Sequence, residues 1–314
     1  ALHGVISLKD GSTVNVCVGE DESDPVFYIT DLLPHLSQEY NEKTVSSAFK
    51  GENLNVLIGG MPLQDAESNA VKMNALRLLN EKYGITEEDF LSAEIEAVPA
   101  IKAKDVGFDR AFVASYGHDD RVCAYPEITA TFETDTDQTV LTILADKEEV
   151  GSEGNSGMQC ILIKDIIDAL AESYGVSSAV VRANSMCLSA DVNAGYDPMY
   201  PEVFEKRNSA LMNCGVVMSK YTGARGKSST SDASAEYVGK IRSIFDANGV
   251  IWQTAELGKV DIGGGGTVAM YIANHNIETV DLGVPVLSMH APYEVISKID
   301  LYMAYKGFLT FFTK

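Results

Sequence analysis

The hydrophobic positions of residues 1–91 form short runs that turn residues separate. Residues 5–7 and 13–18 are two such runs, and Asp10-Gly11 between them is typical of a β-hairpin. Residues 25–30 and 53–58 are further strand candidates, and residues 29–42 are expected to form a short helix. This part of the chain is therefore predicted to be a small β-rich domain.

Helical spacing appears over residues 64–83, where hydrophobic side chains recur mostly every three or four positions up to Gly84. A glycine directly after such a run commonly ends a helix, because it tolerates the left-handed backbone conformation. Thr86 and the three acidic residues after it are typical of the capped start of another helical turn.

Strands and helices are predicted to alternate over residues 92–314, which is the pattern of an α/β layered domain. Residues 139–145 are a largely hydrophobic run of the type found in buried parallel strands. The expected strands are residues 92–99, 139–145, 178–183, 186–190, 250–255, 280–282 and 286–289, and the expected helices are residues 122–132, 156–174, 232–247 and 294–312.

Composition narrows the class of protein. The 314 residues are 46% hydrophobic and 22% charged, which is ordinary for a globular chain and excludes wholesale disorder. No hydrophobic run approaches the roughly 18–20 residues that span a bilayer, so we expect no membrane protein. The net charge of −21 gives no general attraction to nucleic acids or anionic membranes. Five cysteines without CxxC spacing indicate reduced thiols in a reducing compartment, and we expect the cytoplasm.

Polar, metal-competent side chains follow four of the hydrophobic runs. They are Asp119, the pair Glu148 and Glu149, Asp191, and His290. Taken singly, these are ordinary features of caps, turns, solvated acidic loops or structural histidines. Sites of open α/β sheets are built at strand ends, so the four segments together suggest one site. Mixed carboxylate and imidazole donors suit zinc, manganese or cobalt, and a shared carboxylate suits a two-metal hydrolase.

The same segments carry a family resemblance. The motifs are Asp146-Lys147-Glu148-Glu149-Val150-Gly151-Ser152, His118-Asp119-Asp120-Arg121, Ser189-Ala190-Asp191 and Met289-His290. In this series the chain resembles the aspartyl aminopeptidase and vacuolar aminopeptidase I family of dinuclear zinc metallopeptidases. The resemblance implies an exopeptidase that removes N-terminal residues from peptides. It also implies a mixed-sheet α/β catalytic domain with helices on both faces over residues 92–314, and an inserted β-rich dimerisation domain over residues 1–91.

The resemblance assigns roles to the site residues. Asp119 would bridge two divalent ions, zinc in the first place, with cobalt or manganese as alternatives. Glu149 and His290 would complete one metal site, and Asp191 would belong to the other. Glu148 would be the general base.

Further residues would serve the substrate. Gly264 and Gly265 match the family's glycine-rich stretch at the pocket, and Lys220 lies near a pocket lysine of the family. His35 matches a histidine that reaches the active site of a neighbouring subunit and holds the tetrahedral intermediate. The implied partners are peptide substrates and further copies of the chain, as dimers that form a tetrahedral dodecamer.

The chain departs from the family pattern in one respect that bears on the metals. A His-x-Asp segment, expected upstream of the insertion, is not found in this sequence, so the second metal site is expected to be incomplete, with Asp119 and Asp191 alone. The chain is therefore expected to lack the front of its catalytic domain. Two alternatives stay open: a related dinuclear zinc deacylase, and an inactive or truncated scaffold. The native metal and the preferred N-terminal residue are not determined by these motifs.

Overall fold

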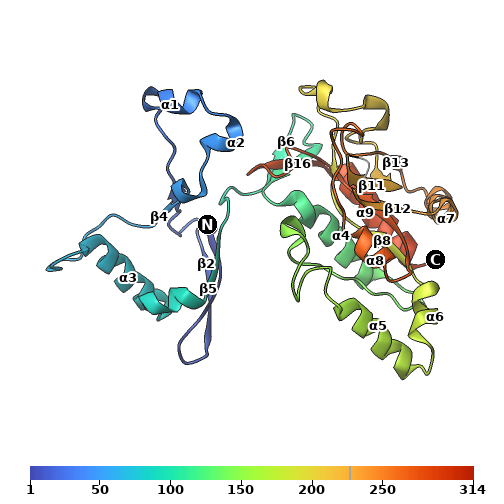
Figure 1. Cartoon of the computed structure of the whole chain (residues 1–314), viewed down its shortest axis with the longest axis horizontal. Coiled ribbons are helices and arrows are strands. Elements are labelled where there is room, and N and C mark those ends of the chain that lie inside the picture. Colours follow the sequence, from blue (N-terminus) through green and yellow to red (C-terminus); the bar gives the residue numbers. More distant parts are fainter. Residues whose placement is uncertain (226–227) are drawn as a thin grey trace. The chain divides into compact units, whose positions relative to one another are not determined.

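Two units make up the fold, Ala1–Lys102 and Ala103–Lys314. The structure is a computed structural model that describes residues 1–225 and 228–314 (Figure 1). Both units contain helices and strands, as the α/β prediction requires. Among the described residues, no helix is both long enough and hydrophobic enough to cross a bilayer.

A three-stranded antiparallel sheet organises the N-terminal unit. Its central strand is β1 (Leu2–Ser7), between β2 (Thr13–Val18) and β5 (Ala93–Ala97), and the predicted hairpin of β1 and β2 is confirmed. Successive side chains of a strand point to opposite faces. One face therefore carries the core of this unit, in which Ile6, Val16, Val18 and Ile85 are buried.

The predicted C-terminal end of the main helix of this unit is confirmed. Helix α3 (Ala70–Tyr83) stops at Gly84, whose φ is 72° and whose amide donates to the carbonyl of Asn80. The expected cap at Thr86 is also confirmed, because its backbone amide donates to Asp89 Oδ2 at 2.7 Å at the start of η3 (Glu87–Ser92). The smaller elements are β3 (Tyr28–Ile29), η1 (Pro34–Leu36), α1 (Gln38–Asn41), α2 (Val45–Ala48), η2 (Gly51–Asn53) and β4 (Val56–Leu57).

The helix expected over residues 29–42 is wrong. Ile29 belongs to β3, and only the single turns η1 and α1 follow it. Pro34 explains the break, because proline has no amide proton and fits only the first turn of a helix. It stands at the first position of η1.

The catalytic part was expected to begin at residue 92. Strand β5 pairs with β1 and so belongs to the N-terminal sheet, and the chain divides after Lys102. Long-range strand pairing decides this point, and no local signal reports it.

The described residues of the C-terminal unit form two mixed sheets and a hairpin. The four-stranded sheet has the order β13-β10-β14-β8, with parallel pairs β10/β13 and β14/β8 and the antiparallel pair β10/β14. The five-stranded sheet has the order β6-β7-β16-β15-β9. The strands are β6 (Lys104–Val106), β7 (Phe112–Ser115), β8 (Met186–Ser189), β9 (Asn193–Ala194), β10 (Val216–Ser219), β11 (Tyr221–Ala224), β12 (Ser228–Asp232), β13 (Trp252–Thr254), β14 (Glu278–Gly283), β15 (Pro285–Leu287) and β16 (Glu294–Ser297).

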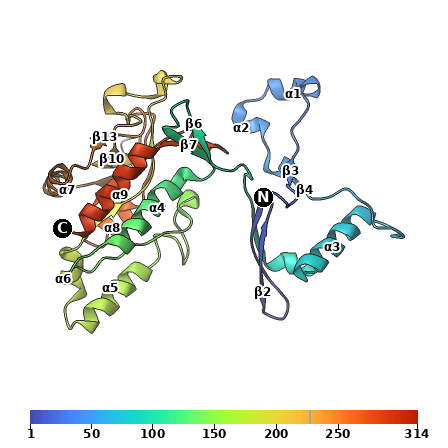
Figure 2. The same cartoon turned by 180° about the vertical axis from the view of Figure 1, so that it is seen from behind.

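Helices cover both faces of the four-stranded sheet. Leu188 of β8 lies in a core with α4, α7 and α9, while its neighbour Cys187 packs into a second cluster with α5 and α8. Figure 2 shows α4 and α9 running along each other, and these two helices are in extensive contact. The helices are α4 (His118–Glu133), η4 (Glu148–Val150), α5 (Leu162–Ser173), α6 (Ser178–Ala183), η5 (Pro201–Val203), η6 (Lys206–Asn208), α7 (Ala235–Ala247), α8 (Ala269–Ala273) and α9 (Lys298–Phe312).

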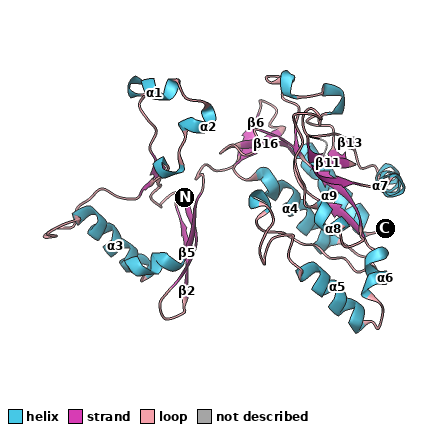
Figure 3. Ribbon diagram, viewed as in Figure 1, coloured by secondary structure: helices cyan, strands magenta, loops and turns pink. Residues whose placement is uncertain are grey.

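Three expected elements of this unit are corrected (Figure 3). Residues 178–183 form helix α6. An ion pair connects it to α5, with Arg182 Nη1 at 3.0 Å from Asp168 Oδ1. Residues 294–297 form strand β16, and α9 begins only after Ser297, whose side chain accepts hydrogen bonds from the amides of the first turn. Residues 139–145 form no strand, and among the described residues no strand edge pairs with them.

Candidate metal centre

Four chain segments deliver the carboxylates and the histidine to one place in the C-terminal unit. Asp119 lies just after β7, where Gly117 adopts a φ of 68° and lets the chain turn into α4. Glu149 lies in η4, Asp191 lies just past β8, and His290 follows β15. Each of them stands at or beyond the end of a strand or in a connecting turn, as expected for a site of an α/β sheet.

Asp119, Glu149 and His290 form the first donor group. His290 Nε2 lies 3.0 Å from Asp119 Oδ2 and 3.3 Å from Glu149 Oε1. One donor atom from each residue lies within 4.8 Å of the others, which is the spacing of ligands around a single ion. Two carboxylates and an imidazole are a common ligand set for zinc.

A second donor group shares Asp119 with the first. It consists of Asp119, Asp120 and Asp191, again with donor atoms within 4.8 Å of one another. Asp120 was not among the predicted ligands, and it supplies a third donor where Asp119 and Asp191 alone were expected. Asp120 Oδ1 is buried and has no hydrogen-bond partner among the described residues. A buried, unpaired carboxylate oxygen is costly unless a proton or a cation satisfies it.

Burial and mutual repulsion make these carboxyl groups weak acids. Burial, followed by the charge of Glu149, raises the pKa of Asp119 to about 7. Burial, followed by the charges of Glu148 and Asp119, raises the pKa of Asp191 to about 8. Burial and the nearby Asp191 also raise the pKa of Asp120. Crowded carboxylates of this kind fit divalent cations, which would replace the protons and offset the repulsion.

Glu148 precedes the donor Glu149 in η4 and belongs to neither donor group. Burial and the charge of Glu149 raise its pKa. It lines a cavity of about 200 Å³ that Asp119, Glu149, Asp191 and His290 also line. The structure therefore brings Glu148 and the four expected ligands to one cavity.

The predicted glycines reach the same cavity. Gly264 and Gly265 both line it. Gly264 has a φ of +90°, and a Cβ there would lie 2.1 Å from the carbonyl oxygen of Gly223. Glycine is needed at this position, since any side chain would push the two backbone segments of the wall apart.

A buried carboxylate joins the two loops that carry Asp119 and His290. Glu294 of β16 is 2% exposed, and it accepts hydrogen bonds from the amide of Asp119 at 2.9 Å and from the amide of His290 at 2.7 Å. Glu294 is not among the predicted site residues, because the hydrophobic spacing predicts a helix over residues 294–312. Its place four residues after the ligand-type His290 is the signal that could have found it.

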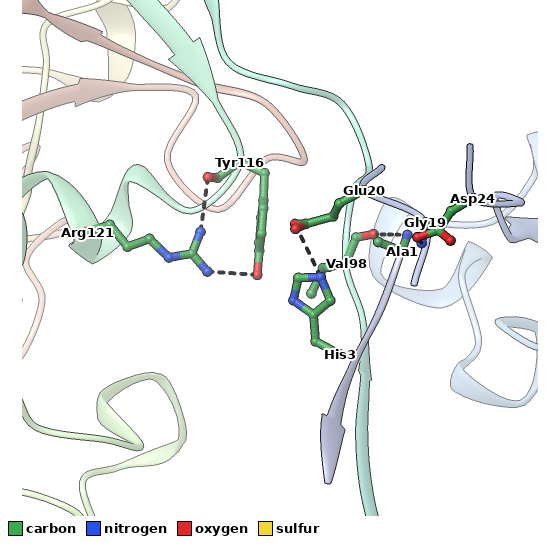
Figure 4. Close-up of polar contacts among 8 residues, drawn as sticks. All are labelled: Ala1, His3, Gly19, Glu20, Asp24, Val98, Tyr116 and Arg121. Atoms are coloured by element: carbon green, nitrogen blue, oxygen red, sulfur yellow. Dashed lines mark hydrogen bonds and ion pairs between the residues drawn. The ribbon is translucent and has the colours of Figure 1, made fainter. Parts of the chain in front are cut away.

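The loop before Asp119 has a second support. Arg121 folds back and donates hydrogen bonds to the carbonyl oxygen of Tyr116 at 3.4 Å and to its hydroxyl oxygen at 3.2 Å (Figure 4). The guanidinium also lies over the Tyr116 ring, 4.7 Å from its centroid. These contacts fix the turn that presents Asp119.

Two expected site residues lie outside the cavity lining. Lys220 forms an ion pair with Asp232. His35 lies in the N-terminal unit, on the exposed turn η1. Lys220 therefore does not line the cavity in this structure, and the expected reach of His35 to a neighbouring subunit's site stays a prediction.

Comparison with known proteins identifies the family to which the chain belongs. The family model described as "Aminopeptidase I zinc metalloprotease (M18)" matches residues 1–312. A probable M18 family aminopeptidase 1 from Clostridium acetobutylicum is 51% identical over 317 residues, which covers 99% of this chain and 68% of the relative.

Solved structures of known proteins share this fold. The crystal structure of an M18 family aminopeptidase from Thermotoga maritima is 43% identical and superposes with a TM-score of 0.95, covering 100% of this chain and 70% of that one. A solved Saccharomyces cerevisiae mApe1 dodecamer has the same fold, with a TM-score of 0.71 at 21% identity, over 99% of this chain and 68% of that one. With a family match over nearly its whole length, the chain belongs to the M18, or aminopeptidase I, family of zinc metalloproteases.

Proposed function

We propose that this M18 aminopeptidase uses two divalent metal ions, zinc in the first place, to remove N-terminal residues from peptides. The observation that carries the proposal is the position of Asp119, which belongs to both donor groups. Its two carboxylate oxygens suit a bridge between the ions. Glu149 and His290 would complete one site, and Asp191, with Asp120 beside it, would hold the other ion. Cobalt or manganese would fit the same donors.

A bound metal pair would polarise the peptide carbonyl and lower the pKa of the attacking water. The chain's own contribution is proton transfer and positioning. Glu148 lies at the cavity wall without being needed as a ligand, so it can accept the proton of the water and return it to the leaving amine. The elevated pKa of Glu148 brings it nearer to the range in which such an exchange works at neutral pH.

The cavity supports a substrate with a free amino terminus. Its volume of about 200 Å³ is enough for one amino-acid residue. Glu256 also lines the cavity and is not a proposed metal donor, so its carboxyl group can pair with the α-amino group, and the strip of Gly264 and Gly265 lets the peptide backbone approach closely. Lys220 stays a proposed substrate contact, which would require it to leave Asp232.

Assembly is the second part of the proposal. The Saccharomyces cerevisiae mApe1 structure, solved as a dodecamer, supports a homo-oligomer. For this chain we propose dimers that form a tetrahedral dodecamer in the cytoplasm. In that assembly the N-terminal unit would act as a dimerisation domain, and His35 would reach a neighbouring subunit's cavity. A donor at the developing oxyanion is worth roughly 3–4 kcal/mol of barrier.

The test is Glu148→Gln, with Glu153→Gln, at an exposed position five residues further along, as the control. We expect Glu148→Gln to lower kcat by about 10²–10⁴-fold on aminoacyl chromophores, with bound metal unchanged. Glu153→Gln should retain activity. Full activity of Glu148→Gln at unchanged metal content would exclude it as the base.

The same assay separates the alternatives. Cleavage of N-acetylated but not free-amine substrates would indicate a deacylase. Absence of turnover at saturating zinc would indicate a scaffold.

A further inference from the structure

We propose a second, separate metal site in the N-terminal unit, formed by His3, Cys17 and Glu20 and suited to zinc. Its donor atoms all lie within 4.8 Å of one another. It shares no residue with the centre around Asp119, and it does not rest on the proposed function.

Strand register brings the first two donors together. His3 of β1 lies directly opposite Cys17 of β2. Directly opposed residues of an antiparallel pair have Cβ atoms about 4.5–5.5 Å apart on the same face. Val16 and Val18, the neighbours of Cys17 in β2, point to the buried core, so Cys17 and the opposed His3 stand on the outer face of the sheet. The two side chains can therefore bind an ion without disturbing the core.

The turn after β2 directs Glu20 back over His3. Gly19 adopts a φ of +105°, and a Cβ at this position would lie 2.8 Å from Cα of Ala1. Its amide donates to Asp24 Oδ2 at 3.0 Å, while the amino group of Ala1 donates to the carbonyl of Val98 at 2.8 Å (Figure 4). This close packing fixes the direction of the chain from which Glu20 reaches His3.

The imidazole is placed for a cation rather than for a hydrogen bond. His3 Nε2 lies 3.2 Å from Glu20 Oε1, which is within ion-pair distance. Figure 4 shows the Glu20 carboxylate facing the imidazole of His3. Yet Nε2 is shielded from solvent and has no hydrogen-bond partner of acceptable geometry among the described residues. A nitrogen that is close to a carboxylate but not aligned with it fits two ligands that point at a common ion.

The donor set selects the metal. Thiolate, imidazole and carboxylate together favour zinc over magnesium or calcium, which prefer oxygen alone. Cys17 is exposed and the Glu20 side chain is 55% exposed, so an ion can enter from solvent. Three protein ligands leave the fourth position of a tetrahedral ion for water.

Cobalt absorption of the whole chain tests the site. The centre around Asp119 has no cysteine among its donors, so thiolate-to-cobalt charge-transfer absorption would report the proposed site alone. We expect this absorption in the parent chain and in Asp119→Asn, but not in Cys17→Ser or His3→Gln. Cys214→Ser, which removes another exposed cysteine, should retain it. Absence of the band in the parent, or its persistence in Cys17→Ser, would overturn the proposal.

Thiol protection gives a second readout that is independent of activity. Zinc should slow alkylation of Cys17 at least tenfold, measured by peptide mass spectrometry, and leave Cys214 as reactive as before. Glu20→Gln should remove the protection, whereas the neighbouring Glu22→Gln should not. Equal alkylation of Cys17 with and without zinc would mean that His3 and Glu20 form an ion pair only, and the metal site would be rejected.

Discussion

At the scale of single residues, Glu294 is the side chain on which the geometry of the metal centre depends. Its carboxylate accepts from the amides of both Asp119 and His290. We predict that Glu294→Gln lowers metal affinity about 10–100-fold, because an amide group has one acceptor instead of two and its NH₂ would face a backbone donor. Chelator competition measures the loss.

Glu202→Gln is the control for this change, since Glu202 is exposed. It should bind metal as the parent does. If Glu294→Gln also binds metal with the parent's affinity, the two loops do not need this bridge.

Asp281 permits a prediction of how the free energy of unfolding depends on pH. Burial raises its pKa to about 7 from an ordinary 3.8. The native state therefore holds a proton that the unfolded state has lost between these pH values, and the free energy of unfolding falls as pH rises through them. Asp281→Asn should remove at most about 1.4 kcal/mol per pH unit from that fall.

Denaturant titrations over this pH range measure the effect of Asp281→Asn at fixed metal content. Asp261→Asn, at an exposed position, should follow the parent. Parallel curves for the parent and Asp281→Asn would show that Asp281 does not carry the proton.

At the scale of elements, β14 and the segment after β8 approach each other so closely at Gly283 that no side chain fits between them. A Cβ on Gly283 would lie 1.5 Å from the carbonyl oxygen of Asp191. We predict that Gly283→Ala displaces Asp191 and destabilises the unit by more than about 3 kcal/mol, as large overpacking effects do. Thermal unfolding and metal content together measure it.

Gly239 in α7 is the matched control, because a Cβ there meets open space. Gly239→Ala should stabilise the chain by about 0.5–1 kcal/mol, since alanine loses less entropy in a helix. A Gly283→Ala variant as stable as the parent would contradict the assigned close approach.

At the scale of the whole molecule, the two units can be followed separately. Trp252 is the single tryptophan and lies in β13, so its fluorescence reports the C-terminal unit alone. We predict that zinc at about 100-fold above its Kd raises the unfolding temperature by about 5–10 °C.

The increase in unfolding temperature on zinc binding should grow from about pH 5 to about pH 8. Asp119 and Asp191, with pKa values of about 7 and about 8, must lose protons before they bind metal. The metal-free unit loses stability over the same range, because its raised carboxyl pKa values favour the protonated native state at low pH. A gain that is constant with pH would show that these carboxyl groups are not the ligands.

Local features were readable in the residues themselves. The Asp10-Gly11 hairpin and the end of α3 at Gly84 depend on a few neighbouring residues, so their signals lie within one turn of chain. The residue types needed for a metal centre, and a family resemblance that the comparisons confirm, were readable in the same way. Ser297 is a usable cap signal for α9, but a longer helix fits the same hydrophobic spacing.

Contacts between segments far apart in the chain decided the elements that were predicted wrongly. Residues 139–145 have the composition of a buried strand, but a strand also needs a neighbouring edge, and none among the described residues pairs with them. Helix α6 has the β-branched residues of a strand, but it packs on α5.

The chain by itself determined which carboxylates and which histidine were available, because chemistry belongs to residue type. Only the tertiary structure decided that Asp120 joins Asp119 and Asp191, that Glu294 ties two loops, and that His3 meets Cys17 and Glu20. The same holds for the acidity of the centre, because a pKa depends on burial and on neighbouring charges that segments far apart in the chain supply.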